Sequence, residues 1–150
     1  MKKSLVVGMV AALVGVTTVG GTIAWAQADV IKERQENRKQ AAAAMRAIKG
    51  VVDAKGPTSG AVEPAAKLKT LEAAFVKLFP AGSDKGDTKA LPAVWTDWAG
   101  FEAANKNAEG AFDKLSVAAG SGDAAALATA FQDAGKACGA CHEKFRAKPQ

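Results

Sequence analysis

The segment DAAALATAFQDAGKACGACHEKFR, residues 123–146, carries the most specific structural information in the chain. Its apolar residues recur at steps of three and four, the period of one face of an α-helix, at Leu127, Phe131, Ala134, Cys138, Cys141 and Phe145. Asp123 is a favourable N-cap for such a helix. The basic residues near its end suit the negative pole of the helix dipole. The segment therefore predicts an amphipathic C-terminal helix with both cysteines on its inner face.

The window Cys138-Gly139-Ala140-Cys141-His142 contains both cysteines and the only histidine of the chain. The pattern C-x-x-C-H is the attachment signature of c-type haem. Two thiols at i and i+3 lie on one helix face and can form thioethers to the two vinyl groups, while the adjacent imidazole projects toward the iron. We therefore expect one covalent haem c, held by Cys138 and Cys141, with His142 as the metal ligand.

The cysteine pair has three alternative interpretations. A thioredoxin-like redox pair would need a βαβ setting, whereas this pair lies in an alanine-rich helix. A disulfide within one helical turn would stabilise the fold little. A zinc site would lack a fourth nitrogen or sulfur ligand, since the chain has no further cysteine or histidine.

Three further helices are predicted upstream, over residues 29–52, 63–79 and 92–118. Their inner stripes are spaced by three and four residues: Ile31, Arg34, Arg38, Ala41, Met45, Ile48 and Val52; Leu68, Leu71, Phe75, Leu78 and Phe79; Trp98, Phe101, Asn105, Ala108, Phe112 and Leu115. Polar connections rich in glycine or proline separate the helices at 56–60, 80–91 and 120–122. Four such helices predict an all-α, antiparallel four-helix bundle with covalently bound haem.

Composition agrees with a single helical domain. The chain has 150 residues, of which 49% are hydrophobic and 6% aromatic, enough to fill one core. Abundant alanine excludes an all-β fold, and two cysteines exclude a disulfide-rich scaffold. The net charge of +5 falls to +3 without Lys2 and Lys3, and no run of basic residues indicates nucleic-acid binding.

Residues 1–26 are expected to be a secretory signal peptide, with the bundle over residues 27–150. Lys2 and Lys3 precede a long apolar stretch that ends in Ala24-Trp25-Ala26, a small-x-small cleavage site. An uncleaved membrane anchor is the alternative, because about 20 uncharged residues are enough to span a bilayer. The glycines and threonines of the stretch and its cleavage site favour export, and thus a mature protein without a membrane partner.

The mature chain resembles the class II c-type cytochromes, the cytochrome c′ and cytochrome c-556 family. The resemblance rests on Val30-Ile31-Lys32-Glu33-Arg34-Gln35, on Pro92-Ala93-Val94-Trp95, and on the C-terminal residues 138–146. It implies a four-helix bundle in a bacterial periplasm, often a homodimer, with one haem edge open to solvent. It also implies that Arg34 and Gln35 approach the haem propionates and that Arg146 lies on the histidine side of the haem. From residue chemistry alone, Arg34 could instead pair with a nearby carboxylate, and Arg146 could be a solvated helix end.

Arg38 departs from the family pattern. The family carries an axial methionine or an apolar shield at this position, and an arginine stays protonated and does not normally ligate iron. Met45, seven residues further along, is about 10.5 Å away along the helix and is expected to be core packing. The sixth iron position is therefore predicted to be open or to hold water, with Arg38 facing it or turned toward a propionate.

The expected function is a periplasmic haem protein that carries electrons, binds small gases such as NO and CO, or does both. Its expected partners are those gases and redox proteins. An enzyme is not expected, because the only histidine is assigned to the iron and a peroxidase needs a further acid–base group. A peroxidase-like or nitric-oxide-detoxifying haem enzyme is the alternative. A structural bundle with a redox-active Cys138–Cys141 pair is the third possibility.

Overall fold

The computed structural model describes residues 20–148, with side chains from residue 29 onward. Every regular element in this range is helical, and one isolated bridge joins Ala90 to Arg146. The elements are α1 (Gly20–Ala54), η1 (Thr58–Ala61), α2 (Val62–Phe75), η2 (Val76–Leu78), α3 (Ala93–Thr96), α4 (Trp98–Ser121) and α5 (Ala124–Phe145). The predicted all-α fold is confirmed.

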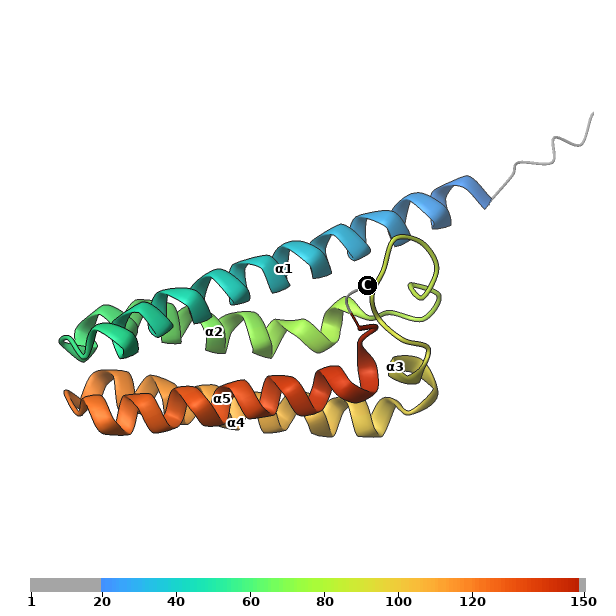
Figure 1. Ribbon diagram of the computed structural model, residues 1–150. Coiled ribbons are helices and arrows are strands. Elements are labelled where there is room, and N and C mark those ends of the chain that lie inside the picture. Colours follow the sequence, from blue (N-terminus) through green and yellow to red (C-terminus); the bar gives the residue numbers. More distant parts are fainter. Residues whose placement is uncertain (1–19, 149–150) are drawn as a thin grey trace, which may run out of the picture.

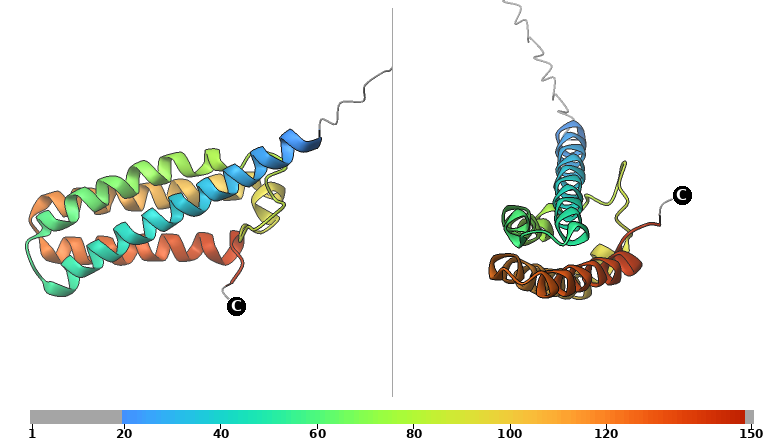
Figure 2. Two further views of the ribbon diagram at one scale, coloured as in Figure 1. Left: turned by 90° about the horizontal axis from the view of Figure 1, so that it is seen from above. Right: turned by 60° about the vertical axis from the view of Figure 1, so that its left-hand side comes forward.

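The four long helices form two antiparallel pairs (Figure 1). The α1–α2 pair lies over the α4–α5 pair, and both pairs turn at the same end of the molecule, while α3 and the long connection before it lie at the other end. Helix α2 packs along α4, but α1 and α5 touch at few positions. The two helices diverge toward the α3 end of the molecule (Figure 1 and Figure 2).

The buried side chains form two separate clusters. The larger one lies toward the turns of the two pairs and is built mainly from alanine and leucine, with Ile48 and Phe112. The smaller one lies at the α3 end and is aromatic, with Phe79, Phe101 and Phe145 in edge-to-face contact. Small side chains let the helices approach closely in the first cluster, whereas rings fill the wider second one.

The N-terminus differs from the sequence prediction. Helix α1 begins at Gly20 rather than near Asp29, so it runs through the expected cleavage site after Ala26. Most of the expected signal peptide, residues 1–19, lies outside the described part of the chain. Within the part that is described, no helix is both long and apolar enough to cross a membrane.

The third predicted helix is also different, because it is broken at Asp97. This residue has φ −128° and ψ 59°, which separates α3 from α4. Its carboxylate accepts a hydrogen bond from the backbone N–H of Gly100 and so caps α4. The same carboxylate pairs with Lys144 of α5, a contact that sequence periodicity does not reveal.

Candidate functional site

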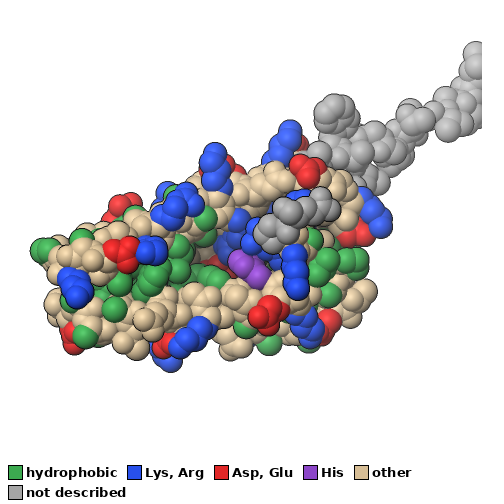
Figure 3. All heavy atoms as spheres, viewed as in Figure 1, with side chains coloured by type: hydrophobic (Ala, Val, Ile, Leu, Met, Phe, Trp, Pro, Cys, Tyr) green, Lys and Arg blue, Asp and Glu red, His purple; other side chains and the backbone are tan. Residues whose placement is uncertain are grey.

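A cavity of about 610 Å³ separates the two core clusters and opens between α1 and α5. Members of both clusters line it, among them Ala41, Leu68 and Phe112 of the larger and Phe79, Phe101 and Phe145 of the smaller. Figure 3 shows the opening as a hollow with the histidine at its edge and apolar side chains inside. Protein interiors are close-packed, so a cavity of this size with apolar walls is a candidate ligand site.

Cys138, Cys141 and His142 all line this cavity from α5. Both thiols are half-buried and free, while His142 lies at the exposed rim. Burial, and next the charge of Glu72, raise the pKa of each thiol. Burial first, and then the positive charges of Arg146 and Arg38, lower the pKa of His142, which favours the neutral imidazole needed to ligate a metal.

These residues fit a covalently attached haem. A large apolar ring system would fill the space between the clusters, with two thiols at its edge and an imidazole beside it. The other interpretations fit less well. Raised thiol pKa values disfavour thiolate exchange chemistry, and no group of three metal-binding side chains that could hold zinc occurs in the described region.

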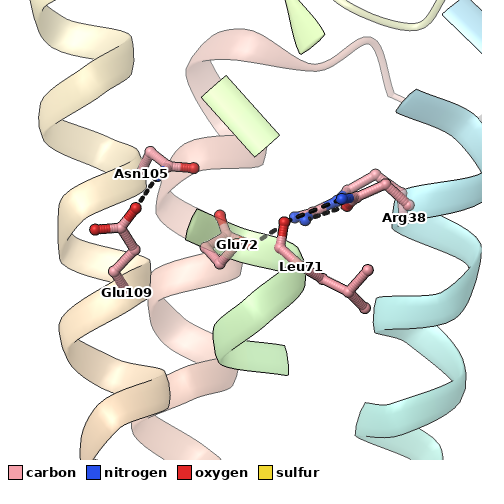
Figure 4. Close-up of polar contacts among 6 residues, drawn as sticks. Arg38, Leu71, Glu72, Asn105 and Glu109 are labelled. Carbon is pink, nitrogen blue, oxygen red and sulfur yellow. Dashed lines mark hydrogen bonds and ion pairs between the residues drawn. The ribbon is translucent and has the colours of Figure 1, made fainter. Parts of the chain in front are cut away.

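The opposite wall of the cavity carries a charge pair that the sequence analysis missed. Nη1 of Arg38 on α1 lies 2.7 Å from Oε2 of Glu72 on α2, whose side chain is only 6% exposed (Figure 4). The guanidinium lies 3.6 Å from the centre of the Phe75 ring. Burial raises the pKa of Glu72, and the charge and hydrogen bond of Arg38 oppose this rise. Arg38 therefore has a carboxylate partner within the protein and is not a solvated surface residue.

The signal that could have revealed Glu72 was present in the sequence. Glu72 follows Leu68 by four residues, so it lies on the apolar stripe predicted for its helix. A charge on an inner stripe needs a partner of opposite charge, and Arg38 poses the same problem on the first helix. The sequence therefore indicated a partner for Glu72 on the first helix, but it did not choose between Arg34 and Arg38, which share that stripe.

Arg34 is 5% exposed and binds the connection between α2 and α3. Its Nη2 donates to the backbone oxygen of Ser83 at 2.6 Å, and its guanidinium lies 4.6 Å from the centre of the Phe79 ring. No carboxylate pairs with it in the described region, and its buried Nε has no hydrogen-bond partner there. Burial lowers the pKa of Arg34, yet a guanidinium remains charged. The expected alternative, a pair with a nearby carboxylate, is therefore not formed.

Gln35 holds the next part of the same connection, because its Nε2 donates to the backbone oxygen of Asp87 at 2.8 Å. The connection then reaches the end of α5, where Leu91 N donates to Phe145 O at 3.0 Å and Ala147 N donates to Lys89 O at 2.8 Å. Residues 79–92 thus form a strap from α1 to the C-terminus. Thr88 and Lys89 of this strap line the cavity, as do Arg34 and Gln35.

The other residues singled out in the sequence lie in the two core clusters or on the cavity wall. Met45 packs against the larger core cluster, as predicted, and also lines the cavity wall. Trp95 and Trp98 are partly buried and pack against the aromatic cluster. Arg146 lines the cavity on the same side as His142 and is exposed.

Comparison with known proteins identifies the family. The family model described as Cytochrome C′ matches residues 29–146. Cytochrome c′ of Rubrivivax gelatinosus is 44% identical over 89 residues, which cover 59% of this chain and 69% of that protein. Cytochrome c-556 of Agrobacterium tumefaciens is 33% identical over 121 residues, covering 79% and 97%.

Solved structures agree. The crystal structure of the Rubrivivax gelatinosus cytochrome c′ has a TM-score of 0.74 at 36% identity, covering 80% of this chain and 96% of that one. A nitric oxide complex of a cytochrome c prime variant from Alcaligenes xylosoxidans has a TM-score of 0.75 at 32% identity, covering 81% and 97%. Proteins of this family hold haem c, consistent with the two thiols found in the cavity. The chain belongs to the cytochrome c′ family.

Proposed function

We propose that this chain is a periplasmic haem protein that binds small gaseous ligands, with electron transfer as a second use of the same iron. The observation that carries the proposal is the arrangement of the cavity, with Cys138, Cys141 and His142 on the α5 wall and Arg38 and Glu72 on the α1–α2 wall. One side thus offers attachment and a ligand for iron. The other offers no histidine.

Within this proposal, Cys138 and Cys141 hold the haem through two thioethers and His142 ligates its iron. Arg34 and Gln35, on the cavity wall beside the strap, lie toward the propionates. The buried and unpartnered Nε of Arg34 supports this role, because buried donors are normally satisfied and a carboxylate would supply the acceptor. When bound, the haem iron supplies reversible gas binding and one-electron exchange.

A sixth iron position without a protein ligand would distinguish a gas-binding haem from a purely low-spin electron carrier. Met45 packs against the larger core cluster and lines the cavity there. It is not proposed as a sixth ligand, because it lies seven residues beyond Arg38 on α1, about 10.5 Å along the helix. A related structure holds nitric oxide, which supports the same ligand class here. We expect the reduced protein to show a high-spin, five-coordinate spectrum and to bind carbon monoxide and nitric oxide.

Electron transfer would use the exposed edge of the site. His142 lies at the rim of the cavity, and lysines and arginines surround the opening in Figure 3. Such an edge is accessible to redox partner proteins. One related cytochrome c′ structure is described as having ligand-controlled dimer dissociation, and a homodimer is part of the same proposal.

Export is proposed through cleavage after residue 26. The family match begins at residue 29, close to the expected mature terminus at Gln27. Mass spectrometry of the protein isolated from the periplasm of an expressing bacterium tests this directly. A mass that includes residues 1–26 would contradict it.

Haem attachment is tested by acid–acetone extraction. The colour should stay with the polypeptide of the unaltered protein, and the paired substitutions Cys138→Ser and Cys141→Ser should release it. Extraction of intact haem from the unaltered protein would refute covalent attachment. A sulfur-to-iron charge-transfer band in the oxidised protein would instead indicate ligation by Met45 and would contradict the open sixth position.

A haem enzyme is the second candidate, and one observation favours it. Glu72 provides an ionisable group beside Arg38 on the cavity wall, the acid–base partner that a peroxidase requires. Peroxide-dependent oxidation of a dye, compared between the unaltered protein and Glu72→Gln, measures this activity. Equal and slow turnover in both proteins would leave gas binding as the function.

A further inference from the structure

Arg38 has unused hydrogen-bond donors on the cavity wall. Its Nη1 donates to Glu72 at 2.7 Å, and its Nε and Nη2 donate to Oδ1 of Asn37 at 2.9 and 2.6 Å. A guanidinium has five N–H groups, so one N–H on each terminal nitrogen has no protein acceptor among the described residues. Arg38 is 32% exposed and lines the cavity, so donors remain for a guest there.

The guanidinium is held in one position by its neighbours. It lies on the ring of Phe75, and its acceptor Asn37 is itself fixed, since Asn37 Nδ2 donates to the backbone oxygen of Leu71 at 3.0 Å. Glu72 is buried on α2 and holds the other side (Figure 4). A donor fixed in this way loses little conformational entropy when a ligand binds.

The positive charge of Arg38 is neutralised by the adjacent carboxylate of Glu72. The two groups form an ion pair on the α1–α2 wall, opposite the α5 wall that carries His142. Arg34 and Lys39 of α1 also line the cavity, but Arg34 binds the strap and the side chain of Lys39 is largely exposed to solvent. For a neutral guest, the pair presents hydrogen-bond donors without a net charge. For an anion, Glu72 adds a like charge that cancels most of the attraction of the guanidinium.

We propose that Arg38 is a fixed hydrogen-bond donor to the outer end of a small ligand, and that Glu72 makes the pocket select neutral ligands over small anions. This inference rests on the proposed function, because it concerns the ligand side of the same haem. The charge of Glu72 sets the preference for neutral over anionic ligands. Arg38 is the residue that touches the ligand.

The test compares an anion with a neutral ligand in the haem-loaded protein. Azide affinity is measured on the oxidised form and carbon monoxide affinity on the reduced form, at pH 7, for the unaltered protein and Glu72→Gln. The matched control is Glu63→Gln, which removes an exposed charge from the first turn of the same helix, outside the cavity. We expect Glu72→Gln to tighten azide binding about tenfold or more and to change carbon monoxide binding less than twofold.

Two further variants assign the effect to Arg38. Arg38→Gln combined with Glu72→Gln should return azide affinity to that of the unaltered protein. Arg38→Gln alone should move the infrared C–O stretch of the carbon monoxide complex to higher wavenumber, because a positive donor near the outer oxygen is lost. The comparison of Glu72→Gln with Glu63→Gln decides the charge effect even if the double variant does not fold.

The outcomes distinguish failure of this inference from failure of the proposed function. If the unaltered protein binds carbon monoxide but Glu72→Gln and Glu63→Gln bind azide equally, the selectivity inference is overturned and the proposed function stands. An unchanged C–O stretch in Arg38→Gln overturns the donor role. If the unaltered protein binds no carbon monoxide, the proposed function fails and this inference fails with it.

Discussion

Replacing Arg38 by leucine should destabilise the fold through Glu72, not through the lost arginine itself. The substitution removes the partner at 2.7 Å and leaves a carboxylate whose side chain is 6% exposed. Breaking a buried pair from one side costs about 3–5 kcal/mol, and loss of the contact with Phe75 adds about 0.5–1 kcal/mol. Because Arg38 is 32% exposed and leucine recovers some packing, we expect the free energy of unfolding to fall by about 3 kcal/mol at pH 8.

The pH dependence follows from the pKa of Glu72. Burial raises this pKa in the folded protein, and without Arg38 it rises further. The folded state then holds a proton that the unfolded state has released, so the loss of stability is complete above the folded pKa. The loss shrinks by up to about 1.4 kcal/mol per pH unit as the pH falls from the folded pKa toward the unfolded value of about 4.3.

Guanidinium unfolding of the haem-loaded protein, followed by far-ultraviolet circular dichroism at pH 8, 6 and 5, measures both effects. The double variant Arg38→Leu with Glu72→Leu should recover most of the loss at pH 8, since an apolar pair of similar volume is often neutral. Lys69→Leu serves as the control, because its pair with Asp113 is exposed on both sides and should contribute less than about 1 kcal/mol. A loss below about 1 kcal/mol for Arg38→Leu at pH 8, or the same loss at pH 5, would show that the carboxylate of Glu72 does not depend on Arg38.

Three other substitutions test the scaffold. Arg34→Met removes the hydrogen bond to Ser83 and should make the strap 79–92 a preferred site of limited proteolysis; an unchanged cleavage pattern would mean that other contacts hold it. Asp123→Ala removes the N-cap of α5 and should lower the free energy of unfolding in urea by about 1 kcal/mol. Phe101→Ala, at the centre of the aromatic cluster and 2% exposed, should cost about 3–5 kcal/mol; a midpoint unchanged from the unaltered protein would contradict its place in the core.

Much of the site was predictable because it is local in the chain. Cys138, Cys141 and His142 occupy one helical turn, so their common face follows from the geometry of an α-helix whatever the rest of the fold does. The inner stripes of the long helices were predicted for the same reason, and Ile48, Leu68, Phe112 and Leu115 are indeed buried. The roles of Arg34 and Gln35 in haem binding stay predictions.

The sequence predictions were wrong or incomplete where a residue contacts a partner far along the chain. Asp97 breaks the third helix and pairs with Lys144, 47 residues away. Helical periodicity does not predict such a contact, because it considers only residues within one helix. Glu72 was overlooked for a related reason, since its partner Arg38 lies 34 residues earlier. Glu72 and Arg38 are each a charged residue on the apolar stripe of its own helix. Each inward position is explained by the ion pair with the other.

The helical class, the inner face of each helix and the haem attachment window could be read from the sequence, because these depend on residues within a few turns of one another. Three features depend on contacts between distant parts of the chain: the cavity between α1 and α5, the strap of residues 79–92 from α1 to the C-terminus, and the pair of Arg38 with Glu72 on the cavity wall. The period of a helix states which side chains point inward, but not which side chains of another helix they meet. Helix packing decides these contacts, because a buried charge is costly unless a group of opposite charge lies beside it.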